Sequence, residues 1–408
     1  MSRVLRGVWV VAALGCVATG QQQTEVRVHV SVAEPMEVLV AMPLPERVVE
    51  VARARTMSPP ALVPAACGAA PDGDGRRPVL AQVALGRDHS CARGVDGSVR
   101  CWGQNLNGAV GDGNTGSDHG PPAPVEVLDL PPASGICTGV DHSCALLRDG
   151  TARCWGNNSN DQVTFAASSA FGHPTAATVG GGIAALACGA RHTCALMREG
   201  AVRCWGDPVY RPGAVRVPLP GRAVEIAAGT DQSCARLTGG RVYCWRPIQG
   251  RAAEVVGLGG AVAGLAVGDG FACARLETGA VACWGAGYQG ELGLGRRGES
   301  AAPQEVPGLS DVTGLVAVGH RACAVTRGGE LRCWGDNRDG LLGTDAGETA
   351  LAPVVVPGLG AVAEAALGGR HACARMHTGP LCCWGDNGYG QLGANARAQR
   401  LGPTPVVW

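Results

Sequence analysis

The sequence contains no lysine: its 34 basic residues are all arginine and are balanced by 34 acidic residues. A chain without excess positive charge lacks the electrostatic footprint of a nucleic-acid-binding protein, so we expect no nucleic-acid partner. The absence of lysine also excludes Schiff-base chemistry and the phosphate-binding loop of nucleotide hydrolases. Only three Phe and four Tyr occur. The core must therefore consist of Val, Ala, Leu and Trp, with covalent help.

Catalytic motifs are also absent. No Gly-x-Ser-x-Gly, His-Glu-x-x-His or phosphate-binding loop occurs, so no nucleophile elbow, zinc-protease helix or nucleotide cradle can be assigned. Residues 96–102 are superficially similar to the Asp-box of sialidase propellers. In that motif Asp and Gly precede Trp by five and three residues, whereas Asp96 and Gly97 precede Trp102 by six and five. We expect no enzyme, no catalytic or metal-binding residues and no cofactor.

The first 20 residues have the composition of a secretory signal peptide, with a basic start and an apolar run from Val8 to Ala18. An alternative is a lipid anchor at Cys16, although Ala13 stands where lipoprotein sites usually carry Leu. No later segment has 18 uninterrupted apolar residues, so we expect no membrane span. The sequence therefore predicts a secreted or envelope-associated protein, extracellular or periplasmic.

Glycine and proline are frequent along the chain. The sequence holds 64 Gly and 26 Pro, which favours turns over long helices. Residues 21–78 differ from residues 79–408: residues 25–32 alternate between apolar and polar and predict one strand, and residues 57–78 are linker-like. We therefore expect an N-terminal strand and linker over 21–78 and a repeat domain over 79–408.

The repeat is marked by cysteine. Seven Cys-Trp dipeptides begin at Cys101, Cys154, Cys204, Cys244, Cys283, Cys333 and Cys383. Another cysteine lies ten residues before each, at Cys91, Cys144, Cys194, Cys234, Cys273, Cys323 and Cys373. An invariant spacing over seven copies predicts seven modules of one structure.

A ten-residue separation with turn residues at its midpoint predicts a β-hairpin. In the second module the chain reverses at Asp149-Gly150, which sets Cys144 opposite Cys154 and leaves Gly150 to adopt a positive φ. Directly opposed cysteines are close enough to bridge. Free thiols and zinc ligands are the alternatives, but no Cys-x-x-Cys occurs, and disulfides are usual behind a signal peptide. Each bridge contributes about 2.5–3 kcal/mol on the chain-entropy model.

Four further cysteines remain once Cys16 is removed or lipidated with the signal: Cys67, Cys137, Cys188 and Cys382. Cys137 and Cys188 have nearly equivalent places in consecutive modules, which predicts a bridge between blades. Cys382 adjoins Cys383 and must point to the opposite face of its strand. Its leftover partner is Cys67, which would attach the N-terminal segment to the last blade.

Seven modules of about four short strands, without helical periodicity, predict a β-propeller in which each blade buries one face against the next. The Trp of each module has a fixed position and is expected in the core. The third and fourth modules lack the Gly-rich stretch after Trp. Deletions of that size belong in loops or outer strands.

The matching unit runs from Gly139 through Cys144, Asp149-Gly150 and Cys154-Trp155-Gly156, with an Asn-x-x-Gly-x-Leu-Gly tail best kept at 337–343 and 387–393. This unit resembles the regulator-of-chromosome-condensation repeat family, in its cysteine-rich form found in secreted bacterial proteins. The resemblance covers roughly residues 79–408. It implies an all-β, seven-bladed β-propeller of RCC1-like repeats with intra-blade disulfides, but says little about function.

One repeat position carries histidine in four modules: His89, His142, His192 and His371. Gln232 and Phe271 replace it in two others, and the sixth module is one residue shorter between Gly319 and Cys323. A ring of histidines around a channel would suit a metal or a pH sensor. With four copies in seven modules, we favour a hydrogen bond that stabilises the turn.

The function implied by the family has to be adapted to an exported chain. The founding eukaryotic member is an exchange factor for a nuclear GTPase, which a secreted protein never meets, whereas a secreted bacterial relative inhibits β-lactamase by covering its active site. We predict a secreted or envelope-associated protein-binding scaffold with an unidentified protein partner. The alternative is a carbohydrate- or surface-polymer-binding module, and inhibition of a secreted enzyme or hydrolysis are further alternatives. The rings available to stack on a glycan are Tyr210, Tyr243, Tyr288, Tyr389 and Trp408.

Overall fold

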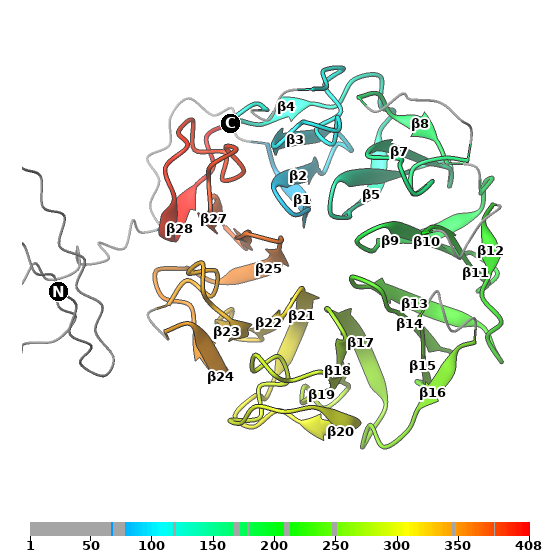
Figure 1. Ribbon diagram of the computed structural model, residues 1–408, viewed down its shortest axis with the longest axis vertical. Coiled ribbons are helices and arrows are strands. Elements are labelled where there is room, and N and C mark those ends of the chain that lie inside the picture. The colour runs from blue at the N-terminus through cyan, green and yellow to red at the C-terminus, as the bar shows by residue number, and fades with distance from the viewer. Residues whose placement is uncertain are drawn as a thin grey trace, which may run out of the picture. The chain divides into compact units, whose positions relative to one another are not determined.

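Seven four-stranded antiparallel sheets form a closed ring in the computed structural model of this chain (Figure 1). The chain divides into residues 1–63 and 64–408. The structure describes residue 67 and residues 78–408, except 117–119, 166–171, 178, 208–212, 247–250, 345–346 and 379. The expected signal peptide, the lipid anchor at Cys16 and the strand at 25–32 lie outside the described residues.

Each blade is one uninterrupted stretch of chain. The first strands lie nearest the middle of the ring (Figure 1) and are β1 (Leu80–Leu85), β5 (Ala133–Thr138), β9 (Ile183–Cys188), β13 (Ala223–Ala228), β17 (Val262–Val267), β21 (Val312–Val318) and β25 (Val362–Leu367). The second strands are β2 (His89–Gly94), β6 (His142–Leu147), β10 (His192–Met197), β14 (Ser233–Leu237), β18 (Phe271–Leu276), β22 (Arg321–Thr326) and β26 (His371–Met376). The third strands are β3 (Val99–Gly103), β7 (Ala152–Gly156), β11 (Val202–Gly206), β15 (Val242–Trp245), β19 (Val281–Gly285), β23 (Leu331–Asp336) and β27 (Leu381–Gly385). The fourth strands are β4 (Val125–Glu126), β8 (Thr175–Ala176), β12 (Val215–Arg216), β16 (Ala253–Val255), β20 (Ser300–Glu305), β24 (Thr349–Val355) and β28 (Arg400–Pro405).

The hairpin between the second and third strands has the predicted register. Cys144 pairs with Cys154 and Gly150 has a φ of 83°. The same register joins the two cysteines of every blade by a disulfide: Cys91–Cys101, Cys144–Cys154, Cys194–Cys204, Cys234–Cys244, Cys273–Cys283, Cys323–Cys333 and Cys373–Cys383. The all-β propeller with a bridge inside each blade is therefore confirmed.

Every first strand carries a β-bulge after its first residue. In β5, for example, Ala133 pairs with Leu147 but Gly135 pairs with Leu146, so Ser134 is the extra residue. A bulge bends the strand and increases its twist. It also sets the buried residues three positions apart, as at Ala133 and Ile136, both of which lie in the core between blades.

Tryptophan side chains fill the spaces between blades. Five of the seven repeat tryptophans are almost completely buried: Trp102, Trp155, Trp205, Trp334 and Trp384. The indole Nε1 of each donates a hydrogen bond to a backbone carbonyl in the loop between the third and fourth strands of the preceding blade. The shortened loops of the third and fourth modules fall between the third and fourth strands, after Gly206 and Trp245.

The ring closes without a shared strand. Blade 7 takes all four strands from the C-terminal part of the chain, and β1 packs beside β25. Trp102 of blade 1 packs edge-to-face on Trp408, with ring centroids 5.9 Å apart. A disulfide joins Cys382 of β27 to Cys67, and a second bridge, Cys137–Cys188, joins β5 to β9. Side-chain packing thus joins blade 1 to blade 7, and neither of these two disulfides links the strands of those blades.

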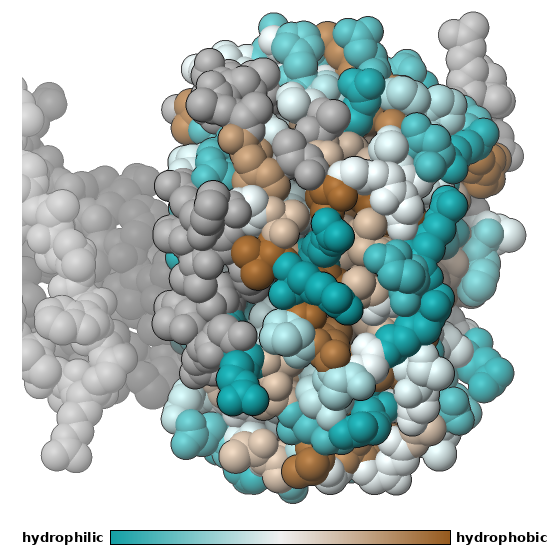
Figure 2. All heavy atoms as spheres, turned by 90° about the vertical axis from the view of Figure 1, so that its right-hand side faces the viewer, coloured by the Kyte–Doolittle hydropathy of each residue, from teal (hydrophilic) through white to brown (hydrophobic). Residues whose placement is uncertain are grey.

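The outer edge that carries β12 and β16 is a mixture of hydrophilic and hydrophobic residues, without one continuous apolar face (Figure 2). Single exposed side chains such as Val215 and Val256 contribute the apolar part. Within the described part of the chain, none of the secondary structure is a helix of the length and apolarity that a membrane crossing requires.

Candidate functional site

The turns between the first and second strands meet at one end of the propeller. We call them the turn ring, which comprises residues 86–89, 139–142, 189–192, 229–232, 268–271, 319–321 and 368–371. Backbone hydrogen bonds join neighbouring turns: Arg87 N donates to Val140 O over 3.0 Å, and Ala190 N donates to Gly229 O over 3.2 Å. At the closure Gly369 N donates to Gly86 O over 3.0 Å. Backbone hydrogen bonds thus join the turns directly at five of the seven junctions between blades.

The four repeated histidines connect this rim from blade to blade. Each places Nε2 within 2.7–3.0 Å of a hydroxyl oxygen in the next blade, in the pairs His89–Ser143, His142–Thr193, His192–Ser233 and His371–Ser90. We call each pair a histidine latch. The sequence predicted a hydrogen bond that stabilises the turn; each histidine forms a hydrogen bond, but its partner lies across the boundary between two blades.

The latches require neutral histidine. Ser143 Oγ donates its proton to Ala109 O over 3.0 Å, so the Nε2–H of His89 must donate to Ser143. Burial lowers the pKa of His89, His142 and His371 to about 3 and that of His192 to about 4. A second ring proton on His142 would be buried without a partner, because its Nδ1 has none. The histidines are structural latches and form no metal centre.

In blades without the histidine, other residues occupy the junction with the next blade. Where Gln232, Phe271 or Arg321 takes the histidine position, the next blade carries alanine instead of a hydroxyl, at Ala272, Ala322 and Ala372. The shorter turn of blade 6 places Arg321 in register with Gly335, as His89 is with Gly103. Its guanidinium donates to Gly369 O of blade 7 over 2.8 Å. A cation thereby replaces the latch at that junction.

The glycines of the turn ring are required by close approach. A Cβ on Gly189 would lie 2.2 Å from Cε1 of His192 and 2.6 Å from Gly229 O of the next turn. We expect Gly189→Ala to lower the free energy of unfolding by about 1–3 kcal/mol through overpacking. Chemical denaturation of the oxidised protein measures this. Gly360→Ala is the control, because a Cβ there meets no atom within 4 Å, and an equal loss in both variants would contradict the steric explanation.

Exposed charges on the turn ring differ from one blade to the next. The side chains of Arg87 and Arg370 are 43% and 51% exposed on adjacent blades 1 and 7, and Asp88 between them is buried. On the other side of the ring Asp231 and Asp269 are 49% and 40% exposed. The exposed charge on this rim therefore changes sign from one arc to the other.

One histidine on this rim is partly exposed. His320 Nδ1 lies 3.1 Å from Glu291 Oε1 and its Nε2 lies 3.9 Å from Asp269 Oδ2. The hydrogen bond with Glu291 raises the pKa of His320. Both of these contacts are carboxylates, so the cluster is a charged surface feature.

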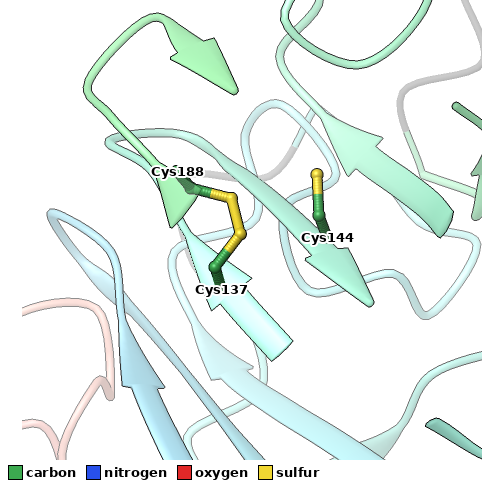
Figure 3. Close-up of side chains that lie close together, drawn as sticks. All are labelled: Cys137, Cys144 and Cys188. Carbon is green, nitrogen blue, oxygen red and sulfur yellow. A yellow bond between two sulfur atoms is a disulfide. The ribbon is translucent and has the colours of Figure 1, made fainter. Parts of the chain in front are cut away.

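Three of the cysteines singled out from the sequence come together beside blade 3. The sulfur atoms of Cys137, Cys144 and Cys188 all lie within 4.8 Å of one another (Figure 3). All three are in disulfides, Cys137–Cys188 and Cys144–Cys154, so none is a thiolate ligand for a metal. Cys67 and Cys382 form their own pair.

The rings considered for glycan stacking are dispersed. Tyr288 is 60% exposed, Tyr243 is buried, and Tyr389 and Trp408 are half-buried. Tyr210 lies outside the described residues. A hollow of about 400 Å³ at the opposite end from the turn ring is lined by Asp311, Arg327 and Arg332 among others, and no aromatic ring lines it.

Two sequence models of the regulator of chromosome condensation (RCC1) repeat match this chain. One matches residues 80–109, 134–162, 183–210 and 312–341, and the other matches residues 96–146, 278–326 and 329–375. The chain belongs to the regulator of chromosome condensation (RCC1) repeat family. The RCC1 repeats carry the cysteine pairs, the tryptophans and the turn ring described above.

Solved structures share the fold. The chain superimposes on human WBSCR16 with a TM-score of 0.67 and 20% identity, over 76% of this chain and 94% of that one. It superimposes on Prp20p of Saccharomyces cerevisiae with a TM-score of 0.67 and 17% identity, over 81% and 87% of the two chains. That structure was described together with the binding of Prp20p to Gsp1p and histones.

Relatives found by sequence share only a few RCC1 repeats. The probable E3 ubiquitin-protein ligase HERC6 of Homo sapiens is 35% identical over 86 residues, which are 21% of this chain and 8% of HERC6. The ultraviolet-B receptor UVR8 of Arabidopsis thaliana is 31% identical over 77 residues, 19% of this chain and 17% of UVR8. The chain thus matches a small part of each relative's length. Among RCC1-like relatives, protein interaction and regulation are the shared activity.

Proposed function

We propose that this protein is a protein-binding scaffold of an oxidising extracellular or envelope compartment, without catalytic activity of its own, and that it binds its partner through the turn ring. The carrying observation is that the exposed charges of the turns differ along the rim, with Arg87 and Arg370 on blades 1 and 7 and with Asp231 and Asp269 on blades 4 and 5. Residues without a like counterpart in the other turns, such as Arg87 and Asp269, make one arc of the rim unlike another. Such a surface suits one asymmetric protein partner.

The compartment is supported by nine disulfides, seven of which close buried hairpins. Disulfides persist in secreted and periplasmic proteins and are rare in reducing compartments. The basic and apolar residues 1–20 support export in the same way. The binding of Prp20p to Gsp1p and histones shows that an RCC1 propeller can carry protein sites, but its partners are not transferred to this chain.

The experiment compares two ends of the same ring. Arg87→Gln with Arg370→Gln alters the turn ring, and Arg198→Gln with Arg327→Gln makes the same change in exposed turns at the opposite end. The oxidised proteins are immobilised, exposed to extracellular and envelope proteins, and the bound proteins are identified by mass spectrometry. We expect one protein to bind wild type and the control, and to lose about tenfold in affinity with the turn-ring variant. Equal binding to all three, binding to a reduced sample, or turnover of a substrate would contradict the proposal.

A further inference from the structure

We propose that Cys137, Cys144, Cys154 and Cys188 form a thiol–disulfide exchange site in which the bridge between blades 2 and 3 relays reduction to the buried disulfide of blade 2. The inference rests on two juxtaposed disulfides. Cys137–Cys188 links β5 to β9, and Cys144–Cys154 links β6 to β7. Figure 3 shows the Cys144 sulfur beside the bonded pair.

The strand register creates this juxtaposition. Cys137 is directly opposite Cys144, and Cys144 is directly opposite Cys154, so the three lie in one row across β5, β6 and β7. Residues opposite one another in neighbouring strands point to the same face. Cys188 enters the row from the next blade. The sulfurs of Cys137, Cys144 and Cys188 consequently fall within 4.8 Å of one another.

The two disulfides differ in accessibility. Cys137 and Cys188 are half-buried, whereas Cys144 and Cys154 have 0% exposure. An external thiol must reach a sulfur to attack it, so it meets the Cys137–Cys188 bridge first. The blade 2 disulfide is shielded from solvent but open to the sulfur of Cys137.

The reaction balances with a dithiol reductant. One thiolate of the reductant attacks Cys188 Sγ, the Cys137–Cys188 bond breaks, and Cys137 leaves as a thiolate. The second thiol of the reductant then attacks the mixed disulfide, which releases Cys188 as a thiol and the reductant as a disulfide. Cys137 Sγ attacks Cys144 Sγ, the Cys144–Cys154 bond breaks, and Cys154 leaves as a thiolate and takes up a proton. The net result is a Cys137–Cys144 bond, two thiols and one oxidised dithiol.

The exchange changes what the disulfides hold together. Before it, one bridge ties blade 2 to blade 3 and another closes the β6–β7 hairpin. After it, a single bridge between β5 and β6 replaces both, and the two blades are no longer covalently joined. A dithiol thus releases the junction while blade 2 keeps one bridge.

Blade 3 is a matched internal control. Its Cys194–Cys204 bridge is equally buried, but the residue opposite Cys194 on β9 is Ala187. No third sulfur stands in that row. The difference between the two blades therefore isolates the contribution of Cys137.

The first test is reduction of the full oxidised chain with limiting dithiothreitol, followed by acid quenching, alkylation and non-reducing peptide mapping. We expect Cys137–Cys144 with alkylated Cys154 and Cys188 as an early product, and loss of Cys144–Cys154 at least about tenfold faster than loss of Cys194–Cys204. Alkylation of Cys137 and Cys188 with Cys144–Cys154 persisting as long as Cys194–Cys204 would overturn the proposal.

The second test needs no reductant. Cys188→Ser leaves Cys137 as a thiol beside Cys144, and we expect alkylation at Cys154 together with a Cys137–Cys144 bond. Cys382→Ser is the matched control, because it frees Cys67 on the face opposite to the Cys373–Cys383 bridge, and we expect that bridge to stay intact. Alkylation confined to Cys137 in the first variant would refute the relay.

Discussion

Acidification of the oxidised protein from pH 7 to pH 5 should lower its free energy of unfolding by about 8 kcal/mol. The four histidine latches cause the loss. Burial holds the pKa of His89, His142 and His371 at about 3 and that of His192 at about 4 in the folded protein. The unfolded chain, with ordinary histidines of pKa about 6.5, binds protons that the folded protein cannot. Stability is therefore complete above pH 6.5 and is lost as the pH falls toward the folded pKa values.

Denaturant titrations at half-unit steps of pH measure this slope. His142→Gln should reduce it by about 1.4 kcal/mol per pH unit, because one of the four depressed groups is gone. Gly360→Ala should leave the slope unchanged, since it removes no titratable group and its added Cβ meets no atom within 4 Å. A stability that stays constant from pH 7 to pH 5 would show that the latches accept protons without opening.

Trp102→Ala should lower the free energy of unfolding by about 3–5 kcal/mol and should open the ring at one place. Trp102 is completely buried where blade 1 meets blade 7, and its Nε1 donates to Gln391 O over 2.9 Å. The indole ring of Trp102 also packs on Trp408. Because no shared strand closes the propeller, removal of this side chain leaves a cavity in the closure itself.

Chemical denaturation gives the magnitude, and hydrogen exchange gives the location. We expect faster exchange in β1 and β25 of Trp102→Ala and unchanged exchange in β9. Trp102→Phe keeps most of the volume and should lose about 1–2 kcal/mol, chiefly for the unpaired carbonyl. Exchange that accelerates evenly around the ring would show that the closure is no weaker than the other six junctions.

Much of the fold can be predicted from spacings within one repeat. The ten-residue cysteine interval and the glycine of its central turn determine the hairpin, its register and its disulfide, all of which are local. The fixed Trp predicts a buried side chain because a repeat position on an inter-blade face cannot be solvent-exposed in every copy. These inferences require no knowledge of how one module meets the next.

The histidine position shows where such local inference ends. Within one module His142 has a turn beside it, which favoured a hydrogen bond to that turn. Its real partner, Thr193, is 51 residues away. The sequence does hold the signal, because each histidine is followed one module later by Ser or Thr, and each replacement of it is followed by Ala. Comparison of successive modules, rather than alignment of all seven, would have revealed the latch.

The bulge was missed for a related reason. A regular strand with one buried face has apolar residues two apart, whereas Val262 and Leu265 of β17 are three apart and both buried. In the other first strands apolar residues also stand three apart, with one or both of them buried. This interval was hidden by the many small residues of these segments, which fit either face.

The matched latches also constrain how such a chain can change during evolution. Each blade is one continuous stretch of sequence, so duplication or loss of a blade is a single genetic event. A histidine in one blade, however, needs a hydroxyl in the second strand of the next blade around the ring. An inserted module must carry a hydroxyl if the blade before it has the histidine. If it has the histidine itself, the blade after it must carry a hydroxyl; otherwise a buried imidazole is left unpaired. The order of the modules is therefore inherited together with their sequences.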